Sequence, residues 1–217
     1  MAILKLDPQS LAPEIRYKLL IGTVVPRPIA VVSSQSPAGA LNIAPFSFFN
    51  VVSHNPMTLA FSISGLKITG EEKDTLRNVR PCDQGGLGEF VVNIATLNFA
   101  HEMAKTASAL PYGESEFEFA GLTPVDSACI VPPRIGEARV SYECKTVQII
   151  VVGQSHLVLG EVVCIHIDDA VLSEKYRIDP TSLEAIGRMA GSQYCHTTAL
   201  FELSDDRSAP QKTSRPE

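Results

Sequence analysis

The chain has 217 residues, 45% of them hydrophobic and 19% charged, and a formal net charge of -6. Its length is enough for one ample core, and its composition excludes a wholly disordered chain. The excess of acidic residues excludes a broad basic surface, so we expect no nucleic-acid partner.

The N-terminal segment carries no long apolar stretch. Residues 1–16 lack the hydrophobic region of a signal peptide, and no later run is long enough to cross a bilayer. We therefore expect a cytoplasmic protein without membrane association. Pro13 can begin a short helix, and residues 17–20 are expected to lead into the first strand.

Strand-like runs rich in Val, Ile, Phe and Thr dominate the rest of the chain. The sequence predicts six strands, at 24–33, 41–52, 58–63, 89–94, 139–152 and 157–167. Because these runs do not alternate regularly with helices, a doubly wound nucleotide-binding domain is disfavoured. We expect a mainly β fold, with a closed or nearly closed sheet and short helices at its periphery.

Four short helical segments are expected, at 74–80, 98–106, 115–119 and 181–188. The proline-rich segment 108–133 reads as an excursion over the sheet, of a kind that often contributes to binding sites. The Gly-rich stretch 83–88 does not match G-x-G-x-x-G and is read as a turn. We expect one domain over 1–203 and a disordered tail at 204–217.

The sequence contains no motif for side-chain catalysis or metal binding. The histidines do not form H-E-x-x-H, and no serine lies in G-x-S-x-G. The cysteines are odd in number, scattered and without a C-x-x-C pair, which argues against a zinc site or a disulfide framework. We expect reduced, buried thiols at Cys82, Cys129, Cys144, Cys164 and Cys195.

Two neighbouring runs, 26–34 and 39–49, combine apolar strand residues with prolines and small polar residues around a turn. Pro45 indicates a strand edge or a break, where main-chain groups are free to meet a ligand. Asn42 and that main chain can satisfy the polar edge of a flat ring. A proline-induced bulge explains the same residues, and we expect core packing for two of Phe46, Phe48 and Phe49.

A cationic turn at 73–75 comes just ahead of the helix predicted at 74–80. Lys73 and Thr75 offer a charge and a hydroxyl, and the first turn of a helix favours an anion such as a phosphate. Capping of the helix by Asp74 or Thr75 accounts for the same residues and is common without any ligand. The residues alone therefore leave both interpretations open.

Three segments, PRPIAVVSS at 26–34, GALNIAPFSFF at 39–49 and KDTLRN at 73–78, resemble the motifs of the flavin reductase-like, FMN-binding split-barrel family, which includes flavoredoxin. The resemblance extends from about residue 17 to about residue 201. It implies a six-stranded antiparallel split β-barrel of Greek-key type, bound FMN, and a homodimer with flavin near the subunit interface. Because a flavin performs the hydride chemistry, no catalytic side chain is then expected.

The resemblance also implies site residues, with Lys73 and Thr75 at the FMN phosphate. Arg27 is expected to touch the flavin or a second substrate, or else to lie exposed at a strand start. His156 occupies the place of a Gly-Asp-His motif near flavin and nicotinamide, although Gln154 and Ser155 depart from that pattern, so it is a candidate nicotinamide contact only. The expected cofactor-binding residues are Arg27, Ser33, Asn42, Ala44, Pro45, Phe46, Ser47, Ser62, Ser64, Lys73, Thr75, Asn78, Arg188 and Tyr194.

Three functions are compatible with these expectations. The first is an FMN-dependent oxidoreductase, either an NAD(P)H:flavin reductase or a flavoredoxin-like electron carrier that serves an oxygenase or another redox partner. A non-enzymatic protein that stores FMN would bind flavin without consuming NAD(P)H. An interaction barrel without a ligand would be indifferent to alanine at Lys73 and Asn42.

Overall fold

The computed structural model describes residues 3–67 and 70–203, and the tail predicted to be disordered at 204–217 lies outside them. Its strands are β1 (Ala30–Gln35), β2 (Leu41–Phe46), β3 (Phe49–His54), β4 (Met57–Ser64), β5 (Glu89–Ile94), β6 (Pro124–Val125), β7 (Arg134–Ile135), β8 (Val140–Val152), β9 (Ser155–Ile167), β10 (Leu172–Ser173), β11 (Arg177–Ile178), β12 (Ile186–Arg188) and β13 (Tyr194–His196). Its helices are α1 (Pro13–Thr23), α2 (Asp74–Val79), α3 (Ala100–Lys105), α4 (Glu116–Ala120) and α5 (Pro180–Leu183), with short 3-10 turns η1 (Pro8–Ser10), η2 (Cys82–Gln84), η3 (Leu97–Phe99), η4 (Asp169–Val171) and η5 (Glu174–Tyr176).

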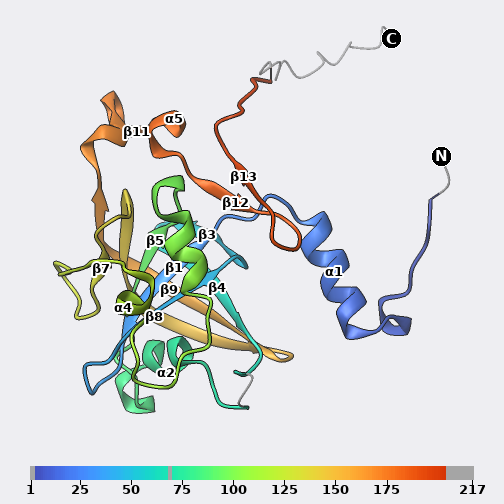
Figure 1. Cartoon of the computed structure of the whole chain (residues 1–217), viewed down its shortest axis with the longest axis horizontal. Coiled ribbons are helices and arrows are strands. Elements are labelled where there is room, and N and C mark those ends of the chain that lie inside the picture. Colours follow the sequence, from blue (N-terminus) through green and yellow to red (C-terminus); the bar gives the residue numbers. More distant parts are fainter. Residues whose placement is uncertain (1–2, 68–69, 204–217) are drawn as a thin grey trace, which may run out of the picture.

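The centre of the fold is a seven-stranded antiparallel sheet in the order β2-β1-β5-β8-β9-β4-β3 (Figure 1). Its two outer strands, β2 and β3, follow each other in the chain and are separated only by Ser47 and Phe48. Across this corner the Ser62 amide donates to the Phe48 carbonyl at 2.8 Å, and the rings of Phe46 and Phe61 lie 5.0 Å apart. The sheet therefore curls back on itself.

The central sheet has one strand more than the six predicted, because the run expected as one strand at 41–52 forms both β2 and β3. Pro45 lacks an N–H group, and at Ser47 the chain leaves β1 and turns toward β4. The mainly β class and the antiparallel pairing are as expected. The other predicted strands appear within a few residues of their expected ends, except that β1 begins at Ala30 rather than 24.

Strand β1 is buried on both faces, which explains its continuous apolar run. Ala30 and Val32 face the barrel interior with Phe61 and Phe90. Val31 belongs to a second core, which also contains buried residues of the segment 95–135. Two hydrophobic cores on opposite sides of β1 thus hold the barrel and its covering segments together. As expected, Phe46 and Phe49 contribute to the core, whereas Phe48 is exposed.

Three of the four predicted helical segments are confirmed, by α2, by η3 with α3, and by α4. Two expectations are wrong. Residues 17–20 lie inside α1, whose residues are all unburied and which stands at the edge of the molecule (Figure 1). The helix predicted at 181–188 ends at Leu183 because Glu184 adopts a left-handed conformation with φ of 52°, after which β12 pairs with β13.

All five cysteines carry free thiols, but only Cys144 is buried. Burial raises the pKa of the Cys144 thiol to about 12. Cys82 and Cys129 are exposed, and Cys164 and Cys195 are half-buried, so the expectation of five buried thiols is wrong for four of them. Among residues 3–67 and 70–203, helices long and apolar enough to traverse a bilayer are lacking.

Candidate functional site

A crevice beside β2 consists of two adjoining cavities that share Pro45 and Ala107. The larger, here the Lys73 cavity, has a volume of about 340 Å³ and lies between β2, the start of α2 and residues 106–110. The smaller, here the Arg188 cavity, has a volume of about 200 Å³ and lies between α1, α3 and β12. Together they have the size and the mixed polar and apolar lining of a small-molecule site.

A buried polar network forms the floor of the Lys73 cavity and joins the three motifs that the sequence singled out. The Asn42 side-chain amide donates to Thr75 Oγ1 at 3.0 Å and to Ser34 Oγ at 3.3 Å. Asn78 Nδ2 donates to the same Ser34 oxygen at 3.1 Å. Asn78 Oδ1 is buried and has no protein partner among the described residues. An unsatisfied buried oxygen is costly unless a water or ligand donates to it.

Lys73 is the cation that this cavity leaves without a counterion. Its side chain lines the cavity, and burial lowers the pKa of its ammonium group. Within residues 3–67 and 70–203 it makes no ion pair, whereas the neighbouring Lys67 is bound to Asp74 at 2.6 Å. A half-buried ammonium group in this state favours an anion in the cavity.

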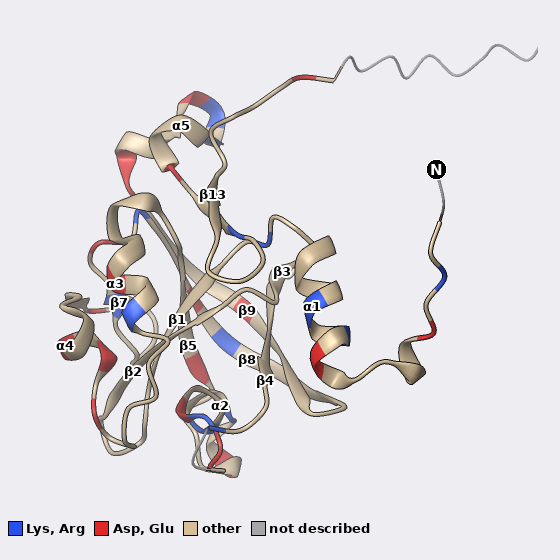
Figure 2. Cartoon of the chain, turned by 45° about the vertical axis from the view of Figure 1, so that its right-hand side comes forward, with Lys and Arg blue, Asp and Glu red and all other residues tan. Residues whose placement is uncertain are grey.

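The preference of this cavity for an anion comes from side-chain charge and not from the dipole of helix α2. The helix has only six residues, so its dipole is weak and the charge must come from side chains. Acidic and basic residues lie together around it (Figure 2), and Arg80 pairs with Glu72 at 2.5 Å. The expectation that Asp74 or Thr75 caps the helix is not met, because the N-cap residue is Lys73 and no side chain caps it.

Glu116 is a cavity residue that the sequence did not reveal. It lies on α4, is 5% exposed, and accepts a hydrogen bond from the Ile43 amide at 3.0 Å. Burial raises the pKa of its carboxyl group, while the Ile43 hydrogen bond opposes the shift. The only sequence signal was an acidic residue among the phenylalanines of a short predicted helix, which also fits a solvated face. Here it covers the open edge of β2 instead.

That hydrogen bond also fixes which main-chain groups of β2 are available. Successive residues of a strand direct their N–H and C=O groups to opposite edges. Since the Ile43 amide points away from β1 to Glu116, Ala44 and Phe46 direct theirs toward β1, with which they pair. The groups left for a ligand are therefore the carbonyls of Ile43 and Pro45 and the main chain of Ser47, where the ladder ends.

Arg27 lines the Arg188 cavity but is already occupied. Its guanidinium donates to the carbonyl oxygens of Ile21, Val24 and Met189 at 2.7, 2.8 and 3.0 Å, and to Ser47 Oγ at 3.4 Å. It is 6% exposed, so the alternative of an exposed arginine at a strand start is wrong. Because all four acceptors are neutral, its positive charge still acts on the cavity.

Arg188 and Tyr194 meet at the mouth of the same cavity. The Arg188 guanidinium lies over the Tyr194 ring, 4.4 Å from its centroid, and donates to the Gly191 carbonyl. Both residues belong to the small β12–β13 hairpin. The structure thus brings together two arginines and an aromatic ring beside Ser47, at the opposite end of the crevice from Lys73.

Four expected residues lie elsewhere. Ser33 is fully buried and donates to the Pro133 carbonyl at 2.6 Å, away from the crevice. Ser62 and Ser64 lie on β4, where Ser64 Oγ accepts from Ser155 at 3.0 Å. His156 belongs to β9 rather than to a turn and lines a separate cavity beside Leu66. None of the four residues is among those that line the two cavities of the crevice, and the His156 cavity shares only Leu66 with the Lys73 cavity.

The family model of the flavin reductase like domain matches residues 21–184. The chain belongs to the flavin reductase-like family. The three motifs that suggested it are the segments that meet at the floor and rim of the Lys73 cavity.

Its relatives include characterised and uncharacterised proteins. An uncharacterized protein of Aquifex aeolicus is 42% identical over 178 residues, which cover 82% of this chain and 88% of the relative. Nitrilotriacetate monooxygenase component B from Bacillus cereus is 37% identical, with a TM-score of 0.87 over 94% of this chain and all of that one. The 2-nitrobenzoate 2-nitroreductase NbaA of Pseudomonas fluorescens is 30% identical, with a TM-score of 0.84 over 96% of this chain and 100% of that chain.

The family and its neighbours indicate an oxidoreductase fold that takes a flavin. They confirm the resemblance to the split-barrel flavin reductases and flavoredoxins that the three motifs suggested.

Proposed function

We propose that this chain binds FMN in the crevice and works as an NAD(P)H:flavin reductase or as a flavoredoxin-like electron carrier. The observation that carries the proposal is Lys73, half-buried and without a counterion, above the buried network of Asn42, Thr75 and Asn78. The FMN phosphate is a dianion, and its negative charge would pair with the Lys73 ammonium group.

The residues of the crevice fit the separate parts of FMN. Lys73 would hold the phosphate by a charge-assisted hydrogen bond, and the Thr75 hydroxyl is close by on the same turn. The ring edge would lie along β2, where the Pro45 carbonyl accepts and the Ser47 main chain is free of the ladder. Phe46 and Ala44 supply apolar wall.

A bound flavin supplies the hydride-accepting and electron-transferring ring, so the protein needs no nucleophile or acid pair of its own. The side chains of the crevice bind, orient and shield. Burial of the Lys73 cavity keeps water from part of the ring, and Glu116 closes the open edge of β2 by its hydrogen bond to Ile43. Burial raises the pKa of its carboxyl group, and an anionic ligand nearby would raise that pKa further.

The Arg188 cavity is the place proposed for the nicotinamide donor. Arg27 and Arg188 place two positive charges beside an aromatic ring, a combination suited to the phosphates and the flat ring of a dinucleotide. Its junction with the Lys73 cavity at Pro45 would bring donor and flavin together. We propose that electrons then pass to an oxygenase or another redox partner.

We also propose that two copies of the chain associate. Aliphatic side chains are exposed on β3 and along the β8–β9 hairpin, at Val51, Val52, Val147, Val151 and Val152. In addition α1 buries none of its residues although Ile15, Leu19 and Leu20 are apolar. Exposed apolar surface of this extent is typical of a protein interface. Sedimentation of the purified protein should give a dimer, and a single species at monomer mass would overturn this part.

Three measurements test the proposed function in sequence. The purified protein, with added FMN, should show the visible absorbance of bound flavin and retain it through gel filtration. NADH and NADPH oxidation should then exceed the rate with free FMN alone. Failure to retain flavin would overturn the proposal, whereas retention without NAD(P)H consumption would favour a flavin-storage protein.

A further inference from the structure

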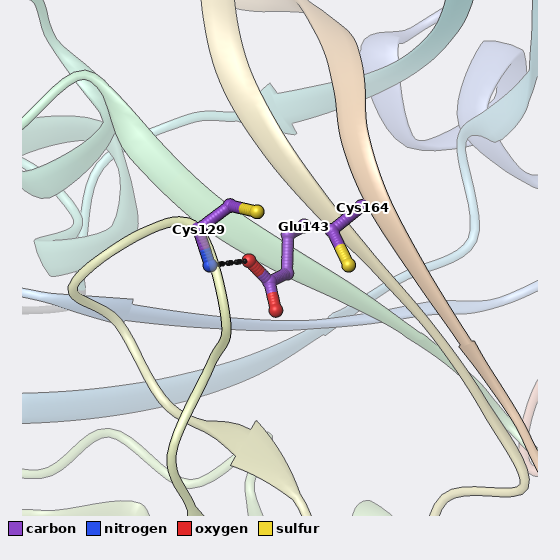
Figure 3. Close-up of side chains that lie close together, drawn as sticks. All are labelled: Cys129, Glu143 and Cys164. Carbon is purple, nitrogen blue, oxygen red and sulfur yellow. Dashed lines mark hydrogen bonds between the residues drawn. The ribbon is translucent and has the colours of Figure 1, made fainter.

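A second cluster of reactive side chains lies on the β8–β9 hairpin and the loop before β7, outside the lining of the crevice. Cys129 Sγ, a carboxylate oxygen of Glu143 and Cys164 Sγ all lie within 4.8 Å of one another (Figure 3). His166 joins them, with Nε2 at 2.5 Å from Glu143 Oε1 and 3.6 Å from Cys164 Sγ. None of the four residues lines the Lys73 cavity or the Arg188 cavity.

The strand geometry holds three of these donors on one face of a rigid hairpin. Cys164 and His166 are two residues apart on β9, so their side chains point to the same side of the sheet. Glu143 lies opposite Cys164 on β8. A register shift between Glu143 and Cys144 interrupts the ladder at this point, and such bulges re-aim side chains locally.

Cys129 comes from the loop between β6 and β7, and the Glu143 carboxylate holds that loop in place. Glu143 is fully buried. Its oxygens accept hydrogen bonds from the amides of Ala128 and Cys129 at 2.6 and 2.7 Å. Figure 3 shows the second of these bonds, with the Cys129 and Cys164 sulfur atoms near the same carboxylate. These main-chain hydrogen bonds therefore hold Cys129 against the β8–β9 hairpin.

Two sulfur atoms, one imidazole nitrogen and one carboxylate form a donor set with a clear chemical preference. Calcium and magnesium take oxygen ligands, whereas thiolate and imidazole suit zinc in tetrahedral, four-ligand structural sites. The carboxylate oxygen Oε2 accepts only the Cys129 amide among the described residues, so it retains a lone pair for a cation.

We propose that Cys129, Glu143 and Cys164 bind one Zn²⁺ ion, with the nearby His166 ring turning from Glu143 to supply the fourth ligand, and that this structural site fastens the loop between β6 and β7 to the β8–β9 hairpin. The two cysteines bind as thiolates and His166 as neutral imidazole. Zinc binding therefore releases the two thiol protons to solvent, and no electron is transferred. The site lies outside the lining of the flavin crevice, and four protein ligands would leave the zinc ion no open position, so its role is to hold the loop rather than to react.

Zinc uptake by the untagged full-length protein tests this assignment. The protein is kept reduced with a phosphine and dialysed against Zn²⁺, and the bound metal is measured by atomic emission. Cys129→Ser and Cys164→Ser each remove one ligand, while Cys82→Ser removes an exposed thiol outside the cluster and is the matched control. Cys129 is exposed, so its substitution leaves the cores intact, and a thermal melt of each variant checks folding.

The expected result is one zinc ion per chain for the wild type and for Cys82→Ser, with at least about a tenfold weaker affinity for each ligand variant. Zinc should also raise the melting temperature of the wild type but not of Cys129→Ser, and it should slow alkylation of Cys129 read by mass spectrometry. Equal zinc uptake in the ligand variants would overturn the assignment. So would a Cys129–Cys164 disulfide together with no zinc uptake by the reduced chain.

Discussion

Removal of the Lys73 charge is the sharpest test of the crevice. Lys73 is half-buried, and no carboxylate or carbonyl partners it among residues 3–67 and 70–203. Lys73→Ala therefore removes a contact to ligand without leaving a protein group unpaired. A hydrogen bond to a charged group contributes about 1.5–3 kcal/mol, which corresponds to an increase of about 10- to 150-fold in the FMN dissociation constant.

Riboflavin lacks the phosphate, and it separates loss of a phosphate contact from general damage to the site. Both flavins would be titrated into apoprotein and followed by quenching of flavin fluorescence. We expect riboflavin affinity to change by less than about twofold, since Lys73 has no other partner to lose. Lys145→Ala is the matched control, because this lysine is exposed on β8 and lies 3.8 Å from Glu89 in a surface ion pair. It should leave both affinities unchanged.

Two results would refute this reasoning. Equal weakening of FMN and riboflavin in Lys73→Ala would mean that the substitution disturbs the cavity as a whole. Unchanged FMN affinity, with the Lys145→Ala control also unchanged, would mean that the phosphate lies elsewhere. In either case the Lys73 cavity would lose its assignment even if the protein bound flavin.

Three further predictions concern packing and protonation. A Cβ at Gly86 would overlap main-chain carbonyl oxygens at the C-terminal end of α2, so Gly86→Ala should destabilise the protein by about 1–3 kcal/mol in urea unfolding. A Cβ at Gly22 in helix α1 meets no atom within 4 Å, so Gly22→Ala should not destabilise it. Because burial raises the pKa of Glu116, its contribution to stability is present below the unfolded pKa near 4.5 and is lost as pH rises through the folded pKa. Glu116→Gln should remove that dependence, and parallel pH profiles of the two proteins would contradict it. Asn93 satisfies two buried donors through Oδ1, so Asn93→Leu should cost about 3 kcal/mol, and a loss under about 0.5 kcal/mol would contradict the network.

The sequence predicted correctly those strands whose apolar pattern begins and ends with the strand itself. The runs at 58–63 and 89–94 alternate or fill a buried strand, and they became β4 and β5 almost unchanged. The run at 41–52 was misread as one strand because its apolar residues continue through the corner at 47–48, where only the change of partner from β1 to β4 divides it. Residues 17–20 are a run of only four apolar or long side chains, and a run this short occurs in helices as well as in strands. The sequence therefore could not show that they belong to α1.

The two clusters of the structure differ in how far the sequence could reveal them. Asn42, Thr75 and Asn78 lie in motifs that could be recognised one by one. The pairing of β1 with β2 sets Asn42 opposite Ser34, and α2, which packs on both strands, brings Thr75 and Asn78 to them. Glu116 and the pair Cys129 and Cys164 carry no local pattern. Their positions depend on the loop path and on the bulged register of the β8–β9 hairpin, which spacing in the sequence does not encode.

Arg27 ties distant parts of the chain to one another. Its guanidinium donates hydrogen bonds to the Ile21 and Val24 carbonyls at the end of α1 and to the Met189 carbonyl, which directly follows β12. If a protease trimmed α1, this buried cation would lose two acceptors at the rim of the crevice. Cleavage within α1 should therefore also loosen the β12–β13 hairpin. A ligand bound in the crevice should slow proteolysis of both α1 and this hairpin.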